Sequence, residues 1–315
     1  MKIVFLDHHT LNADGLSLDA LSVLGEVKAY PRTDGSTLMD RCKGAEVLIS
    51  NKVILERDTL VKLPQLKLIV IAATGYNNVD IETCKEIGIK VCNVREYSTE
   101  SVAQHTMALI LRLVNKIQYY AEEVNNGRWH ASQDFSFYDH SIFELKGKTI
   151  GIVGYGTIGQ RVARIASAFG MNVLAFRRSP FVKDSFSTYA DLPEVFKESD
   201  IISLHAPLNA DSKELINKQT LALMKPSALL INTARGGLIN ELDLAAALNS
   251  GAIAGAALDT LNVEPPIDSP LIGLPNCVVT PHIAWASINS RKNLLDGIIQ
   301  NIIAFQDNAP INVIV

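Results

Sequence analysis

The chain has 315 residues, 48% of them hydrophobic and 20% charged, which is enough for a large buried core and typical of two domains. This composition excludes a disordered or fibrous protein. The formal net charge of −4, with no clustered Lys/Arg face, argues against a nucleic-acid partner and favours a small molecule.

The first residues read as a strand rather than a secretory signal, because an apolar run leads straight into Asp7, His8 and His9. No stretch reaches the roughly 18 apolar residues that would span a bilayer. Four cysteines are scattered without metal-ligand or redox spacing. We therefore expect reduced thiols, no metal site, no membrane segment and a cytoplasmic location. The cysteines are Cys42, Cys84, Cys92 and Cys277.

Apolar runs of strand length recur along the chain, with amphipathic helical patterns such as 157–169 and 241–249 between them. Continuous apolar strands are what burial on both faces requires, so this alternation predicts a doubly wound parallel sheet, formed twice. The predicted strands are residues 2–6, 46–50, 68–72, 149–153, 172–176, 200–205, 228–233, 254–259 and 276–280.

Two places suggest where the chain changes domain. The first is near residue 99, where a long predicted helix, 99–123, precedes a polar, aromatic stretch, 125–139. The second is near residue 286, where a last predicted helix begins that covers residues 286–306 and is here called the closing helix. If that helix packs on the first half, the first domain is discontinuous. The prediction is one domain of residues 1–98 plus 288–315 and a second of residues 99–287, with a cleft between them.

A glycine-rich segment follows the predicted strand 149–153. Gly154 would allow a tight turn, Gly156 would let the backbone approach a pyrophosphate, and Gly159 would let the next helix pack close to the strand. A plain strand-to-helix turn is the alternative. The preceding strand, the amphipathic helix and a second strand favour a dinucleotide site, with Tyr155, Thr157 and Ile158 completing the loop.

The end of the second strand bears on the cofactor type. An enzyme for NAD would carry an acidic residue there for the ribose 2′-hydroxyl, whereas this chain has Arg177, Arg178 and Ser179. Guanidinium and hydroxyl donors suit a 2′-phosphate, so NADP is favoured over NAD. The alternative is that these arginines are simply solvated surface.

Three charged or titratable residues follow apolar strands, at the sheet edge where open α/β folds bind ligands. His282 has the side chain best suited to exchange a proton with an alcohol or carbonyl oxygen. Glu264 would orient the imidazole and stabilise its charged form, and Arg235 offers a planar fork for a carboxylate or carbonyl oxygen. Taken alone, each residue could instead have a purely structural role. His282 would then form hydrogen bonds within a loop, Glu264 would lie in a solvated turn, and Arg235 would cap the end of a strand.

In several ordered blocks the chain resembles the D-2-hydroxyacid dehydrogenase family over essentially its whole length. The blocks are Ala73-Thr-Gly-Tyr-Asn-Asn-Val-Asp, Ser101-Val-Ala-Gln-His, the Gly154 loop, His205-Ala-Pro-Leu, Met224-Lys-Pro, Asn232-Thr-Ala-Arg-Gly-Gly, Ala257-Leu-Asp, Val263-Glu-Pro-Pro and Thr280-Pro-His.

The resemblance implies a flavodoxin-like substrate domain and a Rossmann cofactor domain. It further implies that Arg235, Glu264 and His282 form the catalytic set, with His282 as proton donor in reduction. Backbone amides around Thr74 and Gly75 would hold the substrate carboxylate. The cofactor contacts that it implies are the nicotinamide carboxamide at Ala234 and Asp259, the adenosine side at His205, Ala206 and Pro207, and further contacts at Thr233, His282 and Ala284.

Within the family the chain is similar to the glycerate dehydrogenase or hydroxypyruvate reductase branch, through 135–139, 257–266 and 281–287. Hydroxypyruvate/glycerate and glyoxylate/glycolate are the expected substrates. The pair Ala284-Trp285 departs from the small residues of many members, which leaves the pocket size open. The alternatives are a formate or phosphite dehydrogenase and a non-enzymatic NAD(P)-sensing corepressor, although the chain has no long polar tail for partner recruitment.

The aromatic stretch 125–139 is too apolar for a free loop, so we expect it to pack on something. By resemblance it would be the arm of a homodimer. Packing on its own subunit is the alternative. Its aromatic residues are Trp129, Phe135, Phe137 and Tyr138.

Overall fold

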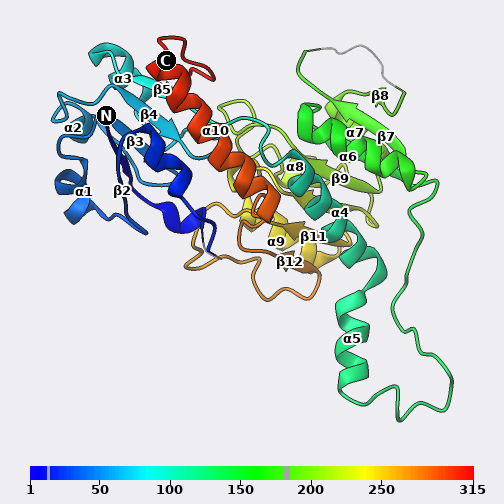
Figure 1. Ribbon diagram of the computed structural model, residues 1–315. Coiled ribbons are helices and arrows are strands. Elements are labelled where there is room, and N and C mark those ends of the chain that lie inside the picture. The colour runs from blue at the N-terminus through cyan, green and yellow to red at the C-terminus, as the bar shows by residue number, and fades with distance from the viewer. Residues whose placement is uncertain (13–14, 180–184) are drawn as a thin grey trace. The chain divides into compact units, whose positions relative to one another are not determined.

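A computed structural model describes residues 1–12, 15–179 and 185–315. The chain forms two compact units (Figure 1): unit 1 is Met1–Ser98 with Ala286–Val315, and unit 2 is Thr99–Trp285. Each unit has its own parallel sheet. Within the described ranges, no helix is long and apolar enough to cross a membrane.

Unit 1 contains a five-stranded parallel sheet in the order β2-β1-β3-β4-β5. Two of the three interior strands, β3 and β4, are buried along their whole length, as their apolar runs require. The strands are β1 (Lys2–Phe5), β2 (Glu26–Ala29), β3 (Val47–Ser50), β4 (Leu68–Ile71) and β5 (Lys90–Cys92).

Two of these strands were not predicted, for a physical reason. The edge strand β2 is largely exposed and partly charged, and β5 has only three residues, so neither carries a long apolar run. The helices of unit 1 are η1 (His8–Thr10), η2 (Asp19–Leu24), α1 (Gly35–Cys42), α2 (Arg57–Leu60), α3 (Ile81–Ile87) and α10 (Ile288–Gln306). The closing helix α10 contacts β4 and η2, so the C-terminal segment belongs to unit 1.

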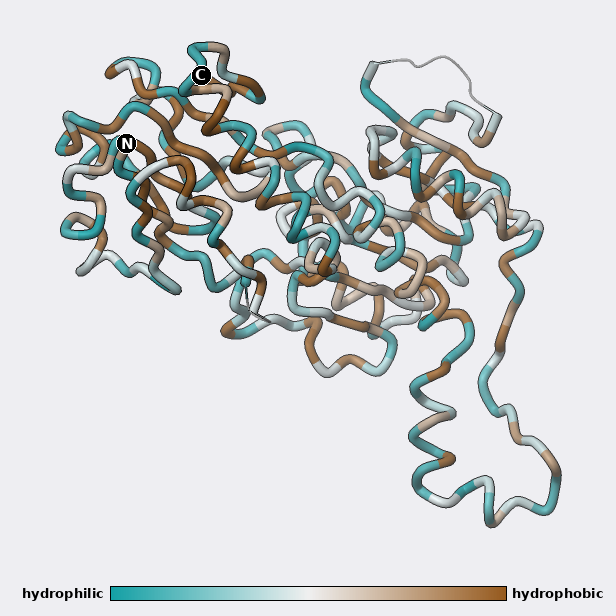
Figure 2. The backbone as a smooth tube through the Cα atoms, in the orientation of Figure 1, coloured by the Kyte–Doolittle hydropathy of each residue, from teal (hydrophilic) through white to brown (hydrophobic). Residues whose placement is uncertain are grey.

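Unit 2 contains a seven-stranded parallel sheet in the order β12-β11-β10-β9-β6-β7-β8. Alternate residues of β10 enter different cores: Leu229 and Ile231 pack in a cluster with residues of α4 and α6, and Leu230 packs in another with residues of α7, α8 and α9. Helices therefore cover both faces, and the doubly wound fold class is confirmed for this sheet. In Figure 2 hydrophobic segments, in brown, alternate with hydrophilic ones, in teal, along both units.

The elements of unit 2 alternate along the chain as predicted, except that the two-residue strand β8 has no sequence signal. The strands are β6 (Thr149–Val153), β7 (Asn172–Phe176), β8 (Thr188–Tyr189), β9 (Ile201–Leu204), β10 (Leu229–Asn232), β11 (Gly255–Leu258) and β12 (Cys277–Val279). The helices are α4 (Thr99–Asn115), α5 (Ile117–Asn125), α6 (Thr157–Ala168), α7 (Leu192–Glu198), α8 (Lys218–Leu221), η3 (Gly236–Leu238) and α9 (Glu241–Ser250).

The long helix predicted over 99–123 is wrong as a single helix. Lys116 adopts a left-handed backbone, with φ of 54°, between α4 and α5, and such a residue interrupts the helical hydrogen-bond ladder. In Figure 1, α5 and the loop after it extend away from the rest of unit 2. We call residues 117–143 the arm.

Candidate active site

The glycine loop joins β6 to α6. Gly154 has φ of 100°, and a side-chain carbon there would lie 2.4 Å from the amide nitrogen of Ala206. A side-chain carbon on Gly159 would lie 2.2 Å from the carbonyl oxygen of Gly154. At Gly156, by contrast, it would meet no atom of the chain within 4 Å. Gly154 and Gly159 are therefore required by packing, whereas Gly156 borders open space.

The beginning of α6 fits a pyrophosphate. Gly156 is its N-cap and supplies no side-chain acceptor, and the first amides of a helix attract an anion. Thr157, Ile158 and Gly159 provide those amides. Tyr155 is 2% exposed and its side chain packs in the core, so its ring does not face a ligand.

The basic residues after β7 are all exposed. Arg177 and Ser179 lie at the surface beside Arg178, which forms an ion pair with Asp211. Because both partners of the pair are largely solvent-exposed, it is weak and separable. A carboxylate thus lies next to one of the two guanidinium groups predicted to bind a 2′-phosphate.

The residues after β9 close against the glycine loop. The carbonyl carbon of His205 and the amide of Ala206 lie beside Gly154, and the carbonyl oxygen of Pro207 accepts a hydrogen bond from Ser212 at 2.7 Å. Burial lowers the pKa of His205 to about 4. Its Nε2 atom lies 2.8 Å from the hydroxyl of Ser203, so the ring is a neutral hydrogen-bonding group near pH 7.

Arg235 follows β10 in a loop that Asn232 organises. The fully buried side chain of Asn232 donates to the carbonyl of Arg235 at 2.9 Å and accepts from the amide of Ala234 at 3.0 Å. Thr233 Oγ1 lies 3.0 Å from the hydroxyl of Thr106 on α4. These bonds fix the backbone on both sides of the guanidinium-bearing residue.

Glu264 and His282 form a hydrogen-bonded pair. Nδ1 of His282 lies 2.6 Å from Oε2 of Glu264, and the other oxygen of Glu264 accepts the amide of Leu261 at 3.0 Å. Their side chains are 33% and 26% exposed, respectively. A carboxylate on Nδ1 orients the ring and leaves Nε2 outside this pair.

The three residues share one edge of the sheet. Arg235 follows β10, Glu264 lies in the loop after β11, and His282 lies in the loop after β12. These strands are neighbours and parallel, so their carboxyl ends lie side by side, where open α/β sheets bind ligands. The adjacent strand ends thus bring the loops of the three residues to one edge, while the guanidinium of Arg235 donates to the carbonyl of Ala234 at 2.8 Å.

Asp259, at the end of β11, holds the His282 loop. Its carboxylate accepts the amides of Ile283 and Ala284 at 2.9 and 2.8 Å, and its carbonyl accepts the amide of His282 at 2.9 Å. Burial alone would raise the pKa of Asp259, but hydrogen bonds from His105, Thr280 and these amides lower it. Asp259 is therefore an ionised, internally bonded carboxylate. Its contact with the nicotinamide carboxamide and the cofactor contact of Ala284 stay predictions.

Sequence reasoning missed the role of His105. The residue lies on α4, with Nε2 at 3.1 Å from the hydroxyl of Thr280 and 3.4 Å from Asp259. The only signal in the sequence was the block Ser101-Val-Ala-Gln-His. Ser101 also takes part, since its hydroxyl donates to the carbonyl of Ala284 at 2.6 Å.

Thr74 and Gly75 belong to unit 1, in the loop after β4. Thr74 donates its hydroxyl to the carbonyl of Val94 at 3.0 Å, and its own carbonyl accepts from Asn93 at 2.7 Å. These bonds tie the loop to the carboxyl end of β5. The role of both residues in substrate binding stays a prediction.

Known proteins resemble the chain over its whole length. The sequence profile of the D-isomer specific 2-hydroxyacid dehydrogenase NAD binding domain matches residues 107–284. The chain is 40% identical to the hydroxypyruvate reductase of Blautia hydrogenotrophica, over 100% of this chain and 99% of that protein. It is 41% identical to the glycerate dehydrogenase of Methylorubrum extorquens, over 99% and 98%.

A solved structure agrees in fold. An acyclic imino acid reductase in complex with NADPH and D-Arg matches with a TM-score of 0.90 and 33% identity, covering 100% of both chains. The glycine loop, the parallel sheet and the His–Glu pair at its edge define a nicotinamide-dependent oxidoreductase. The chain belongs to the D-isomer specific 2-hydroxyacid dehydrogenase family. The predicted family and fold class are thereby confirmed.

Proposed function

We propose that the protein reduces hydroxypyruvate or glyoxylate to the corresponding 2-hydroxy acid. The observation that carries this proposal is the 2.6 Å pair of His282 and Glu264 at the sheet edge that also bears Arg235. Relatives named hydroxypyruvate reductase and glycerate dehydrogenase at 40% and 41% identity over nearly the whole chain support this substrate class.

Each residue has a distinct role in the proposed reaction. The nicotinamide, when bound, supplies a hydride to the carbonyl carbon. Nε2 of protonated His282 donates a proton to the carbonyl oxygen, and Glu264 stabilises the imidazolium before this transfer. Arg235 binds the carboxylate or the carbonyl oxygen through its planar fork. The amides around Thr74 and Gly75 hold the substrate carboxylate.

We further propose that NADPH is the preferred cofactor. Support comes from three exposed donors, Arg177, Arg178 and Ser179, where an enzyme for NAD would carry a carboxylate. The similar imino acid reductase is in complex with NADPH. The ion pair of Arg178 with Asp211 opposes this preference, because the carboxylate competes with a phosphate for the same guanidinium.

Turnover of a panel of substrates tests the proposal. The purified chain is mixed with NADPH or NADH and with hydroxypyruvate, glyoxylate, other 2-oxo acids, and a 2-oxo acid with an amine. We expect the highest kcat/KM for hydroxypyruvate or glyoxylate with NADPH. Turnover only in the presence of the amine would replace this function by imine reduction, as the name of the similar structure suggests.

Two alternative functions can be distinguished by further measurements. Oxidation of formate or phosphite with NAD(P)+ would identify a formate or phosphite dehydrogenase. Cofactor binding without turnover of any substrate would favour a corepressor-like NAD(P) sensor. The cytoplasmic location stays a prediction, consistent with four free cysteines.

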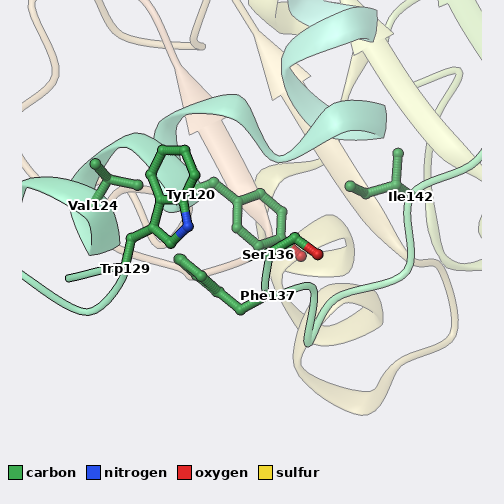
Figure 3. A pocket seen from close by; sticks show the side chains of 6 residues that line it. All are labelled: Tyr120, Val124, Trp129, Ser136, Phe137 and Ile142. Atoms are coloured by element: carbon green, nitrogen blue, oxygen red, sulfur yellow. The ribbon is translucent and has the colours of Figure 1, made fainter. Parts of the chain in front are cut away.

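We also propose a homodimer formed through the arm. Six residues line an apolar hollow of about 260 Å³ within the arm (Figure 3): Tyr120, Val124, Trp129, Ser136, Phe137 and Ile142. Beside it, Phe135 is 91% and Tyr138 79% exposed. Residues of the arm thus pack on one another, and the arm still exposes two rings that a second copy would bury.

Light scattering on the purified chain measures the oligomeric state. We expect a dimer that Phe135→Asp converts to a monomer at micromolar concentration, because a charge at the buried centre of an interface is costly. A monomeric parent chain, or a Phe135→Asp variant that remains dimeric, would refute the arm as the interface.

A further inference from the structure

The His282 loop is held in a conformation that a histidine rarely adopts. His282 has φ of 53°, and a non-glycine residue in the left-handed region persists only where its surroundings impose it. Three hydrogen bonds from the loop reach Asp259: the amide of His282 to the main-chain carbonyl, and the amides of Ile283 and Ala284 to the carboxylate. Asp259 is therefore the anchor of this loop.

Asp259 is in turn held by Thr280 and by His105 of helix α4. The hydroxyl of Thr280 lies 2.6 Å from Oδ1 of Asp259, and Nε2 of His105 lies 3.1 Å from that hydroxyl and 3.4 Å from the same Oδ1. The Asp259 side chain is fully buried, while His105 is 20% exposed. All of these groups lie in unit 2.

The number of available donors fixes the direction of these bonds. An ionised carboxylate only accepts, so the hydroxyl of Thr280 donates its single proton to Asp259. The oxygen of Thr280 can then only accept from His105, which must carry its proton on Nε2. His105 is therefore the donor at the start of a chain that runs through Thr280 and Asp259 to the backbone of His282.

We propose that His105 is a positioning residue for His282: its Nε2–H group fixes Thr280 and Asp259, and thereby the left-handed loop that aims the imidazole. The inference rests on the proposed role of His282 as proton donor. His105 touches neither His282 nor Glu264 in this chain of bonds, so its contribution is orientation rather than proton transfer.

The proposed role of His105 can be tested separately from the packing of helix α4. Helix α4 is anchored by buried apolar side chains such as Ala103, Met107 and Ile110, which lie in the core of unit 2. Removing the imidazole leaves these contacts intact. A defect caused by loss of His105 should therefore appear in turnover before it appears in folding.

The test compares His105→Ala with His105→Gln in the full-length chain. The glutamine amide can present an N–H donor in place of Nε2, whereas alanine cannot. For His105→Ala we expect kcat to fall about 10-fold, as misplacement of a proton donor does, with the Kd of NADPH within about twofold. His105→Gln should recover most of kcat. The exposed His130→Gln is the matched control and should behave as the parent.

A second readout does not need turnover. Hydrogen exchange of the amides of His282, Ile283 and Ala284, followed by mass spectrometry, should accelerate about 10-fold or more in His105→Ala and stay near the parent rate in His105→Gln. Unchanged exchange, or equal defects in both variants together with equal loss of thermal stability, would overturn the positioning role. Faster exchange in a chain that turns over no substrate would support the positioning of the loop while refuting the proposed function.

Discussion

Nδ1 of His282 lies 2.6 Å from Oε2 of Glu264, and the other carboxylate oxygen of Glu264 accepts the amide of Leu261. One carboxylate oxygen of Glu264 is thus held by a backbone amide, while the other lies against the imidazole. This geometry pairs one ring nitrogen of His282 with Glu264 and leaves the other outside the pair. Removing the charge but not the shape of Glu264 should therefore affect proton transfer more than binding.

For Glu264→Gln we predict a fall in kcat of about 10- to 100-fold, because a neutral amide does not stabilise the imidazolium. The Kd of NADPH, measured by fluorescence titration, should change little. Glu194→Gln, on the exposed face of α7, is the control. A kcat for Glu264→Gln equal to that of the control would remove the assigned role.

Two glycines of the cofactor loop should respond differently to alanine. At Gly156 the added carbon meets no protein atom, so the melting temperature should hold while the Kd of NADPH rises about 10-fold through loss of close backbone approach. At Gly159 the added carbon lies 2.2 Å from the carbonyl oxygen of Gly154. That substitution should destabilise the fold by about 1–3 kcal/mol. Unchanged NADPH binding by Gly156→Ala would contradict a pyrophosphate at this loop.

Asp211 should tune cofactor choice through Arg178. Asp211→Asn releases the guanidinium and removes a negative charge, so we predict that NADPH binds up to about fivefold more tightly, the scale of an exposed ion pair. The affinity for NADH should not change. Arg177→Asp should instead reduce the preference for NADPH over NADH. Weaker NADPH binding by Asp211→Asn, or a preference unaffected by Arg177→Asp, would count against this assignment of the strand end.

His205 should make the stability of unit 2 depend on pH. Its pKa is lowered from 6.5 to about 4 by burial, so between these values the unfolded chain binds a proton that the folded chain does not. The free energy of unfolding should therefore rise with pH across this window, by at most about 3 kcal/mol for this group. Both tryptophans, Trp129 and Trp285, lie in unit 2, so urea unfolding followed by their fluorescence reports it.

The comparison variant is His205→Gln, which cannot take up this proton. Its stability should vary less with pH between 4 and 6.5 than that of the parent. Asp259 and Asp200, whose pKa values are lowered, add a loss at lower pH in both proteins. Parallel pH curves for parent and variant would contradict a neutral, partly buried His205.

Much of the fold follows from local patterns in the sequence. Strands such as β3, β4 and β10 are buried on both faces, and their unbroken apolar runs predict them directly. The exposed edge strand β2 and the two-residue β8 escape prediction, because neither buries enough apolar surface to leave a pattern. The left-handed Lys116 between α4 and α5 has no mark in the sequence, since lysine shows no preference for that conformation.

The candidate site, like the fold, could be predicted from the sequence only in part. Glu264 and His282 can be proposed as a pair from their chemistry and from the order of their strands, although their catalytic roles stay predictions. The partnership of His105 with Thr280 spans 175 residues of sequence, and no local spacing indicates it. Such contacts depend on how α4 packs on the sheet, which only the folded chain shows.

The most direct test follows the hydride. The protein is given a 2-oxo acid and NADPH deuterated at the transferable position of the nicotinamide C4, and the product is examined by NMR and chiral chromatography. We predict deuterium at C2 of a D-2-hydroxy acid, formed by the parent chain and not by His282→Ala. A product without deuterium at C2, or equal product from His282→Ala, would contradict hydride transfer assisted by His282.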